Sequence, residues 1–581
     1  MAAGVQLDEH LIANGLIAPE LLYRRLAEAL GAPYLDHYAP LAPGLDPRLA
    51  IEAGIAPLAP NARGLGYVLA PRGRALTALL RRGIGGARAV PDFAIAEPTH
   101  FTRMVLVAEA RRIARDASLG LAALRPDLSA AGARGRPLAL LAFSAILLLA
   151  FLLAGPATGA AISIFFCGLF MAAVLQRLWA LGASLVDRQP APAMLDDHAL
   201  PAYSIILPVY REARVVQNLL RAVAALDYPK AKLDVKLVVE AGDRETLDAL
   251  RGANLPAYCE AIVAPPGAPR TKPRALNVAL PFCRGDLVTI YDAEDEPDPG
   301  QLRLAAATFA AAPATLGCLQ ARLCIDNAAD SWLTALFALE YAALFDVINH
   351  GLGGLAQPFP LGGTSNHFRI DMLRRVRGWD AWNVTEDADL GIRLTRFGVA
   401  TGVIASCTHE EAPASLRAWR MQRQRWLKGW MQTLLTHGRH PRRFFREAGP
   451  WAACTMLITM LGAVLGALLG PALFLLAAWR LLTPDAVDPA ESLLPLDALI
   501  TQTLFWLGTV SCLWPLLLGA RRRRLARQLL YLPLLPAYYL LMSLAAWGAL
   551  IELFRDPHRW NKTEHGLART TRRPAPKVAR P

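Results

Sequence analysis

The sequence has little of what several common classes of protein require. Its eight cysteines include no CxxC pair and no spacing with histidine typical of metal ligands, so we expect buried thiols in a reducing compartment. The polar regions contain no basic stripe with interleaved aromatic residues, which argues against nucleic acid as a partner despite a net charge of +13. No long apolar stretch precedes Pro137, so no cleavable signal peptide and a cytosolic N-terminus are expected.

Apolar residues, by contrast, are abundant and concentrated. They make up 54% of the chain, whose mean hydropathy is +0.30, and they gather in two blocks, residues 137–185 and 451–554. Basic residues crowd beside these blocks, as in 438-HGRHPRRFFR-447 and 521-RRRRLAR-527, where anionic lipid and the positive-inside rule account for them. The composition predicts a multi-pass protein of the bacterial inner (cytoplasmic) membrane, with membrane lipids as partners.

The first apolar block predicts a membrane hairpin. Residues 137–155 carry no charge, and after a short loop at 156–159 a second apolar run continues to about residue 185. Arginine flanks both ends of the hairpin, which places these ends and the polar stretch 200–440 in the cytosol.

The second block leaves the number of crossings open. Residues 451–482 and 499–519 are predicted spans on either side of a periplasmic acidic loop at 484–492. The last run, 529–554, is long for one span and short for two. We favour a break at Pro533 and Pro536 into an interfacial or re-entrant piece plus one span, which keeps a basic tail, residues 555–581, in the cytosol.

Residues 1–125 have the character of a small soluble domain. Leucine and isoleucine recur at helical spacing between Leu11 and Leu26, and two short helices joined by a turn at Gly15 would share one apolar face. We expect a cytosolic regulatory or docking module.

The stretch 200–440 alternates short apolar runs with helical patterns such as 212–226 and 301–312. The candidate strands are 203–210, 234–241, 261–265, 286–295, 315–323 and 399–406. This layout predicts an open, mostly parallel α/β sheet, whose ligands lie at the carboxyl ends of the strands.

Closely spaced carboxylates follow one of these strands. The run 287-LVTIYDAEDEPDP-299 places Asp292, Glu294 and Asp295 directly after apolar strand residues. Such carboxylates suit a hard divalent cation, which in turn neutralises a diphosphate. An acidic surface loop is the alternative interpretation.

Two further clusters carry candidate chemistry. In 383-NVTEDADLGIRL-394 a capping box would explain Thr385 and Glu386, whereas Asp387 is a candidate general base. The segment 417-RAWRMQRQRWLKGWMQ-432 is a basic amphipathic helix with Gln422, Arg425 and Trp426. An interfacial helix with snorkelling Arg423 and Lys428 is a compatible alternative.

The order of these elements resembles that of the processive family 2 glycosyltransferases, such as cellulose and hyaluronan synthases, with their D-D-DxD-TED-QxxRW series. Here 292-DAE-294 stands at the DxD, 385-TED-387 at the TED and 422-QRQRW-426 at the QxxRW. The resemblance implies a cytosolic, GT-A-like α/β catalytic domain over residues 200–440. This domain would be inserted between α-helical transmembrane segments and preceded by the small N-terminal soluble domain.

The resemblance also implies roles for individual residues. Asp387, together with Glu386, would be catalytic and take the proton of the acceptor hydroxyl, giving inversion, while Asp292 and Glu294 would hold Mg²⁺ or Mn²⁺. The implied donor-binding residues are Tyr210, Glu212, Glu240, Asp243, Lys272, Asp292, Gln422 and Arg425. The implied acceptor-binding residues are Trp426 and Asn366, and 558-HRWNKTEHG-566 looks like a gating segment with Trp560, Lys562 and Thr563.

The sequence departs from the family pattern in two places. Where the family has aspartate for uracil, 239-VEAGDRET-246 offers Glu240 and Asp243 as substitutes, and a UDP-sugar remains the expected donor. The metal motif keeps the two carboxylates of Asp292 and Glu294, with Asp295 as a further candidate.

The implied function is synthesis and outward translocation of an extracellular polysaccharide from a nucleotide sugar, with the growing glycan as acceptor. A non-processive transferase that adds one sugar to a lipid carrier would use the same carboxylates. An inactive membrane scaffold or cyclic-dinucleotide sensor is an alternative of another class. Residues 1–125 resemble the N-terminal domain of type II secretion and pilus assembly ATPases, some of which bind a cyclic dinucleotide, which implies cyclic di-GMP as a ligand there.

Overall fold

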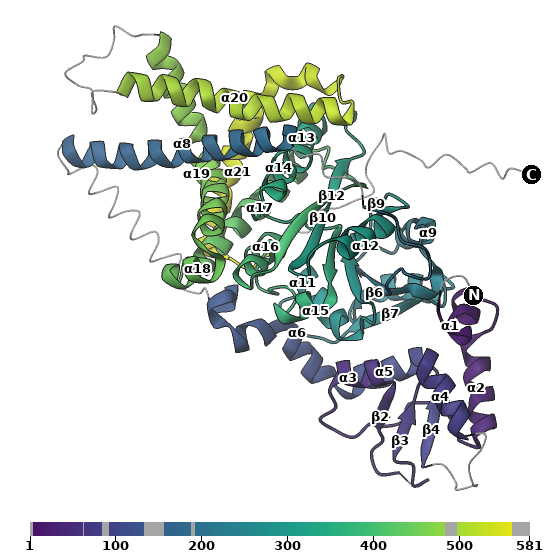
Figure 1. Cartoon of the computed structure of the whole chain (residues 1–581). Coiled ribbons are helices and arrows are strands. Elements are labelled where there is room, and N and C mark those ends of the chain that lie inside the picture. The colour runs from purple at the N-terminus through teal and green to yellow at the C-terminus, as the bar shows by residue number, and fades with distance from the viewer. Residues whose placement is uncertain are drawn as a thin grey trace, which may run out of the picture. The chain divides into compact units, whose positions relative to one another are not determined.

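The computed structural model describes residues 4–61, 63–83, 92–132, 156–186, 192–482 and 497–560. The chain divides into two compact units, coloured by residue number in Figure 1. Unit 1 comprises Met1–Leu124, Ala191–Gly317 and Thr364–Ala381, and unit 2 comprises Arg125–Pro190, Cys318–Gly363 and Trp382–Pro581.

The N-terminal part of unit 1 is a small α/β domain. Its elements are α1 (Leu7–Ala13), α2 (Pro19–Leu30), β1 (Tyr34–Leu35), α3 (Pro47–Ala53), β2 (Ile55–Pro57), β3 (Tyr67–Leu69), α4 (Gly73–Gly83), β4 (Phe93–Ala96), α5 (Pro98–Ala108) and α6 (Ala110–Leu124). The strand order is β1-β4-β3-β2, with β4 parallel to both of its neighbours and β2 antiparallel to β3. The turn predicted at Gly15 is confirmed, because Gly15 has the left-handed φ of +69° that glycine adopts without strain.

The rest of unit 1 is a mixed α/β sheet with its helices. Its elements are β5 (Tyr203–Val209), α9 (Val216–Ala225), η3 (Lys230–Lys232), β6 (Leu233–Glu240), α10 (Arg244–Arg251), β7 (Cys259–Ala264), α11 (Lys272–Ala279), η4 (Leu280–Phe282), β8 (Leu287–Ile290), β9 (Glu296–Pro297), α12 (Gln301–Ala311), β11 (Asn366–Arg369) and α15 (Ile370–Arg375). Strands β7, β6, β5 and β8 are parallel neighbours in that order, and β11 pairs antiparallel with β8.

Burial explains why these strands read as continuous apolar runs in the sequence. Every residue of β8 is buried, as are all residues of β6 except its last, because helices cover both faces of a parallel sheet. The parallel direction brings the carboxyl ends of β5, β6 and β8 to one edge, as predicted from the alternation of elements.

The two parts of unit 1 are packed together. Helix α6 lies against α11, α3 lies against η4, and Arg374 of α15 donates a hydrogen bond to Glu52 of α3 at 2.9 Å. The N-terminal domain is therefore in contact with the sheet domain over several elements.

Unit 2 is mainly helical. Its elements are η1 (Pro126–Leu128), η2 (Ala130–Gly132), α8 (Pro156–Val186), most of β10 (Leu316–Ile325), α13 (Trp332–Ala343), the π-helix η5 (Leu344–Ile348), α14 (Asn349–Gly354), α16 (Glu386–Arg396), β12 (Ala400–Glu410), α17 (Leu416–His437), α18 (Pro441–Ala448), α19 (Pro450–Leu482), α20 (Asp497–Arg523), η8 (Gln528–Leu534) and α21 (Leu535–Arg555). Helix α17 packs on α21 and α19, and α8 packs on α20 and α19 (Figure 1).

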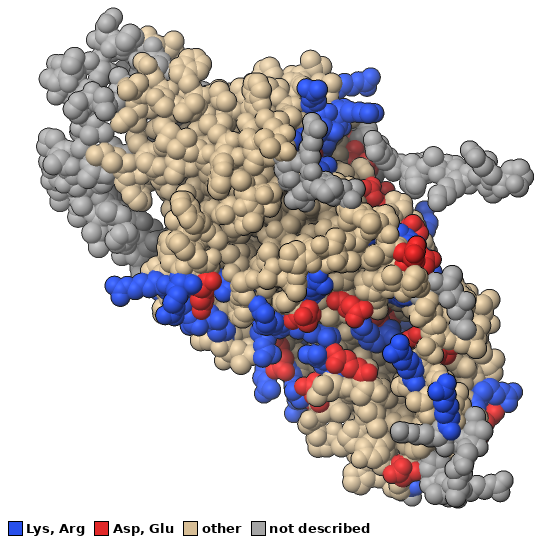
Figure 2. All heavy atoms as spheres, viewed as in Figure 1, with Lys and Arg blue, Asp and Glu red and all other residues tan. Residues whose placement is uncertain are grey.

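Within the described residues, five helices are long and apolar enough to cross a membrane: Ile164–Val186, Trp332–Gly354, Pro450–Pro471, Gln502–Arg523 and Gln528–Arg555. The predicted spans at 451–482 and 499–519 match helices α19 and α20. In Figure 2 the described surface over α8, α19 and α20 is largely tan. Large apolar side chains of α8 and α20 are exposed, among them Trp179, Trp506 and Trp514.

One expectation about these helices is wrong, and one helix is not predicted from the sequence. The predicted loop at 156–159 is instead the first turn of α8, since Pro156 occupies a helical start where its missing N–H costs nothing. The apolar helix over Trp332–Gly354 is not predicted from the sequence. In its most apolar stretch of 18 residues, 83% is buried inside the protein. The predicted first hairpin helix at 137–155 and the acidic loop at 484–492 lie outside the described residues.

The last apolar run changes from a 3₁₀ helix to an α-helix at the two prolines where a break is predicted. The 3₁₀ helix η8 ends at Leu534 and α21 begins at Leu535, beside Pro533 and Pro536, so the run consists of a short piece followed by one helix of 21 residues. Such a helix is long enough for one span.

Candidate active site

The acidic motif of unit 1 follows the buried strand β8. Asp292 and Glu294 are half-buried, whereas Ala293 and Asp295 point inward and are buried. The Asp295 carboxylate accepts a hydrogen bond from the Asp292 backbone N–H at 2.7 Å and another from the Thr364 hydroxyl. Asp295 therefore fixes the loop, while Asp292 and Glu294 are its more accessible carboxylates.

Lys272, the first residue of α11, forms an ion pair with Asp292. This pair joins the amino end of α11 to the carboxyl end of β8. A lysine beside a carboxylate at a helix N-terminus is an arrangement that suits the negative charge of a diphosphate.

The predicted base-binding residues differ in their surroundings. Glu240, at the end of β6, is half-buried, accepts a hydrogen bond from Arg274 at 3.1 Å, and has its pKa raised by burial. Asp243 is buried and caps α10 by accepting from the Thr246 N–H at 3.3 Å; it also accepts from the Arg211 N–H. Of the two, Glu240 is therefore better placed to meet a ligand.

The other predicted residues of unit 1 lie at the ends of the same strands. Tyr210 and Glu212 follow β5, and the Glu212 N–H donates to the Thr246 hydroxyl at 3.1 Å. Asn366 is buried at the start of β11, next to Ser365, whose N–H donates to the Ile290 carbonyl of β8 at 2.8 Å. Unit 1 thus gathers its candidate donor residues along one sheet edge.

The TED motif of unit 2 begins helix α16. Thr385 occupies the N-cap, but its side chain makes no cap hydrogen bond, so the capping alternative from the sequence is not realised. Asn383 instead orients this turn, accepting from the Thr385 N–H at 3.0 Å and donating to the Thr433 hydroxyl of α17 at 2.8 Å. Glu386 is buried, whereas Asp387 is half-buried.

The QxxRW motif lies on α17, against the TED turn. Arg425 donates a hydrogen bond to the Val384 carbonyl at 3.4 Å, and Gly429 has no room for a β-carbon because the Thr385 side chain fills that space. Trp426 stacks on Tyr341 of α13 at a centroid distance of 6.4 Å and an interplanar angle of 16°. Gln422 is buried. Unit 2 therefore brings together two motifs separated by some 40 residues of chain.

The expectation that Arg423 and Lys428 snorkel towards a membrane surface is wrong. Arg423 is buried and donates two hydrogen bonds to Glu340, at 2.8 and 2.7 Å, while its guanidinium lies 4.2 Å from the Phe337 ring centre. Lys428 is completely buried and pairs with Glu552 at 3.1 Å. Both cations therefore fasten α17 to neighbouring helices, since a buried charge requires a partner.

The chain after α21 runs along the same helix. The Arg559 carbonyl accepts from Lys428 at 2.8 Å, the Pro557 carbonyl accepts from Gln432 at 2.6 Å, and the Trp560 ring centre lies 4.8 Å from the Arg425 guanidinium. Of the predicted gating residues, Trp560 is thus in contact with the QxxRW motif. Lys562 and Thr563 lie outside the described residues.

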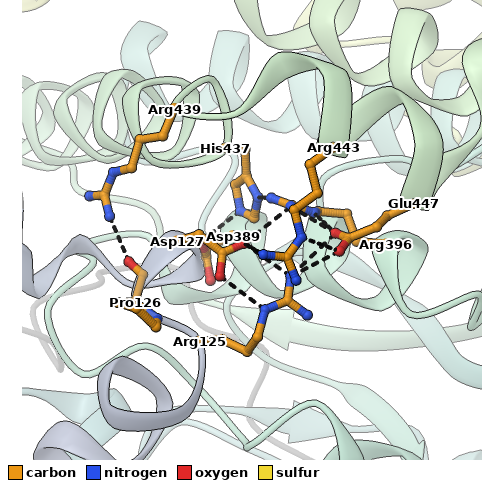
Figure 3. Close-up of polar contacts among 9 residues, drawn as sticks. All are labelled: Arg125, Pro126, Asp127, Asp389, Arg396, His437, Arg439, Arg443 and Glu447. Carbon is orange, nitrogen blue, oxygen red and sulfur yellow. Dashed lines mark hydrogen bonds and ion pairs between the residues drawn. The ribbon is translucent and has the colours of Figure 1, made fainter.

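A buried polar cluster at the far end of α16 was not anticipated from the sequence (Figure 3). Asp389 accepts from His437 Nε2 at 2.9 Å, and Arg396 donates to His437 Nδ1 at 3.0 Å. Asp389 also accepts from Arg393 at 3.0 Å. A guanidinium can only donate, so Nδ1 accepts and the imidazole is neutral, consistent with a His437 pKa lowered by burial. Arg125, Asp127 and Glu447 extend this cluster to η1 and α18.

Comparison with known proteins shows which class of protein this region is similar to. Residues 201–429 match the family described as "Glycosyltransferase like family 2". This part of the chain is therefore similar to glycosyltransferases of family 2, and the described residues include helices apolar enough to span a membrane.

Individual relatives agree with this class. The "Probable glycosyltransferase YdaM" of Bacillus subtilis (strain 168) is 27% identical over 236 residues, 40% of this chain and 55% of that protein. The "Beta-monoglucosyldiacylglycerol synthase" of Synechocystis sp. is 29% identical over 273 residues, 45% of this chain and 55% of that protein. The chain spans about half the length of these curated relatives.

Solved structures with a similar trace include the mannosyltransferase PcManGT of Pyrobaculum calidifontis in complex with GDP-Man and Mn²⁺. It is 20% identical, with 59% of this chain and 98% of that chain covered, and the TM-score is 0.37.

Proposed function

We propose that the protein is an inverting membrane glycosyltransferase that transfers a sugar from a nucleotide-sugar donor at the cytosolic face of the bacterial inner membrane. The observation that carries the proposal is the packing of the TED turn on the QxxRW helix, through Arg425 on the Val384 carbonyl and Gly429 on Thr385. An acidic surface loop, a capping box or an interfacial helix would each explain one motif, but none requires this contact.

The donor residues act on the nucleotide and the diphosphate. Glu240, Tyr210 and Glu212 lie at strand ends where a nucleotide binds in open α/β sheets, and a UDP-sugar is the donor we propose. Lys272 and Arg425 supply positive charge to the departing diphosphate, and Arg425 can do so with two parallel hydrogen bonds.

Asp292 and Glu294 would hold Mg²⁺ or Mn²⁺. The fit is chemical: two half-buried carboxylates of one loop offer hard oxygen ligands, with Lys272 beside them. Among the described residues no three His, Cys, Asp or Glu side chains are grouped in a way that could hold a metal. The cation would offset charge on the nucleoside diphosphate.

Asp387 acts as the general base. Its carboxylate is half-buried at the start of α16, a carboxylate being one of the side chains that serve as a general base. The acceptor hydroxyl attacks the anomeric carbon as it loses its proton to Asp387, and inversion follows from a single displacement. Trp426, with Asn366, is the proposed acceptor contact, and the stacking of Trp426 on Tyr341 holds its ring in place.

The apolar helices of unit 2 support a membrane location. If the protein synthesises a polysaccharide and moves it outward, these helices would also form the path for the growing glycan. The contact between the Arg425 guanidinium and the Trp560 ring supports a gating role for the segment that follows α21. A second candidate is the transfer of a single sugar to a lipid, favoured by the similarity to a glycolipid synthase. Product length separates the two: purified protein incubated with donor yields a ladder of glycans in the first case and one glycosylated lipid in the second.

A further inference from the structure

Arg274 of α11 is completely buried and joins α6, β6 and the loop after β7. Its Nη1 donates to the Glu240 carboxylate at 3.1 Å, its Nη2 donates to the Pro265 carbonyl, and its Nε donates to the Ser118 hydroxyl at 3.3 Å. All of these residues belong to unit 1.

The contact with Ser118 connects the N-terminal domain to the candidate donor site. Ser118 lies on α6, the last helix of that domain, and is buried against α11. The preceding residue is bound as well, because the Ala117 carbonyl accepts a hydrogen bond from Asn277 Nδ2 of α11 at 3.0 Å. Two adjacent residues of α6 therefore hold the helix that begins with Lys272.

The chemistry of the contact makes it sensitive to position. A guanidinium is a rigid planar fork, so a shift of Arg274 towards or away from α6 changes the hydrogen bonds that it makes with Glu240. Burial opposes the negative charge on Glu240 and raises its pKa. The nearby positive charge of Arg274 is the largest influence in the opposite direction. Space for adjustment is small, because even a β-carbon at Gly267 would meet the guanidinium.

We propose that Ser118 is a positioning residue for donor recognition: α6 fixes Arg274, and Arg274 fixes Glu240 for the nucleotide part of the donor. The N-terminal domain thereby sets the affinity for the donor and leaves the chemical step unchanged. This inference rests on the proposed function, since it takes Glu240 to contact the donor nucleotide.

The test uses the full-length protein in lipid nanodiscs and measures, by calorimetry, the dissociation constants of UDP, GDP and ADP, followed by steady-state kinetics. Ser118→Ala should raise the dissociation constant of the tightest-binding nucleoside diphosphate by roughly 3–10-fold, the effect expected from losing one hydrogen bond. KM for the donor should rise by the same factor, with kcat unchanged. Arg274→Lys should weaken nucleotide binding at least as much. Arg115→Ala, on the exposed side of α6 with 70% of its side chain accessible, should have no effect.

A double-variant cycle separates positioning from plain structural support. In the Glu240→Gln background, Ser118→Ala should have no further effect on nucleotide affinity, because the group it positions is already changed. An effect of equal size in both backgrounds, or unchanged affinity in Ser118→Ala, overturns the inference and leaves the proposed function standing. If the wild-type protein binds none of the three nucleotides, the proposed function fails and the inference fails with it.

Discussion

Thr385 and Gly429 are in direct contact, with the threonine side chain filling the space that a β-carbon on Gly429 would occupy. Glycine at this position of α17 costs helix stability, since alanine is the better helix former by about 1 kcal/mol. The close approach is the compensating gain, because it sets the TED turn against the QxxRW helix.

Gly429→Ala should therefore be harmful even though alanine favours helix. We expect a loss of about 1–3 kcal/mol in unfolding free energy from overpacking and a fall in sugar transfer of roughly tenfold or more, as the turn carrying Asp387 is displaced. Thermal unfolding and transfer rates in nanodiscs measure both. Gly466→Ala in α19 is the matched control, since nothing lies within 4 Å of a β-carbon there; equal behaviour of the two variants would contradict the account.

Asp387→Asn should separate binding from chemistry. Donor affinity should stay close to that of the wild type, while the rate falls by roughly 10²–10⁴-fold, the usual contribution of a general base. Asp371→Asn, on the exposed side of α15, serves as the control. Parallel losses of donor affinity and rate would assign Asp387 to structure rather than to proton transfer.

Asp292→Ala should abolish turnover and remove the effect of Mg²⁺ or Mn²⁺ on nucleotide binding, because the cation loses one of two protein carboxylates. Calorimetry of UDP binding with and without Mg²⁺ provides a readout independent of turnover. Asp248→Ala, whose side chain is 69% exposed, should leave that effect intact. Wild-type activity that persists unchanged in EDTA would rule out the metal role.

Acid should destabilise the protein through His437. Burial lowers the pKa of His437 below its ordinary value of 6.5, so below that pH the unfolded state binds the proton more tightly than the folded state. The contribution of the neutral His437 to the free energy of unfolding is complete above pH 6.5 and is lost as the pH falls below that value. His367, whose pKa is lowered by burial to about 3, also destabilises the folded state as the pH falls.

Chemical unfolding followed from pH 7 to pH 5 measures this effect. His437→Gln should be less stable than the wild type but show a shallower decline in unfolding free energy as the pH falls. A wild-type stability that rises towards pH 5 would contradict the assigned neutral imidazole.

The strands and motif helices were predictable from local pattern. Buried parallel strands such as β6 and β8 give continuous apolar runs, and the helix from Glu386 begins where its acidic first turn suggests. What could not be foreseen depends on distant partners. Arg423 looks like a surface cation within its own helix, and its burial follows only from Glu340, 83 residues away.

The helix Trp332–Gly354 was missed for a related reason. Glu340 and Asp346 interrupt its apolar pattern, and its mean hydropathy of 1.3 is the lowest of the five apolar helices found among the described residues. Both carboxylates are paired in the structure, Glu340 with Arg423 and Asp346 with Arg523. Ion pairing thus allows a charged sequence to occupy a buried helix.

The most direct test of the central claim is the release of nucleoside diphosphate by purified full-length protein in lipid nanodiscs, supplied with lipid and glycan acceptors and a panel of nucleotide sugars. We predict release with one donor, most readily a UDP-sugar, together with a glycosylated product and a loss of roughly 10²–10⁴-fold in Asp387→Asn. Absence of release with every donor, or release that Asp387→Asn leaves unchanged, would contradict the assignment of this chain as a glycosyltransferase with Asp387 as its base.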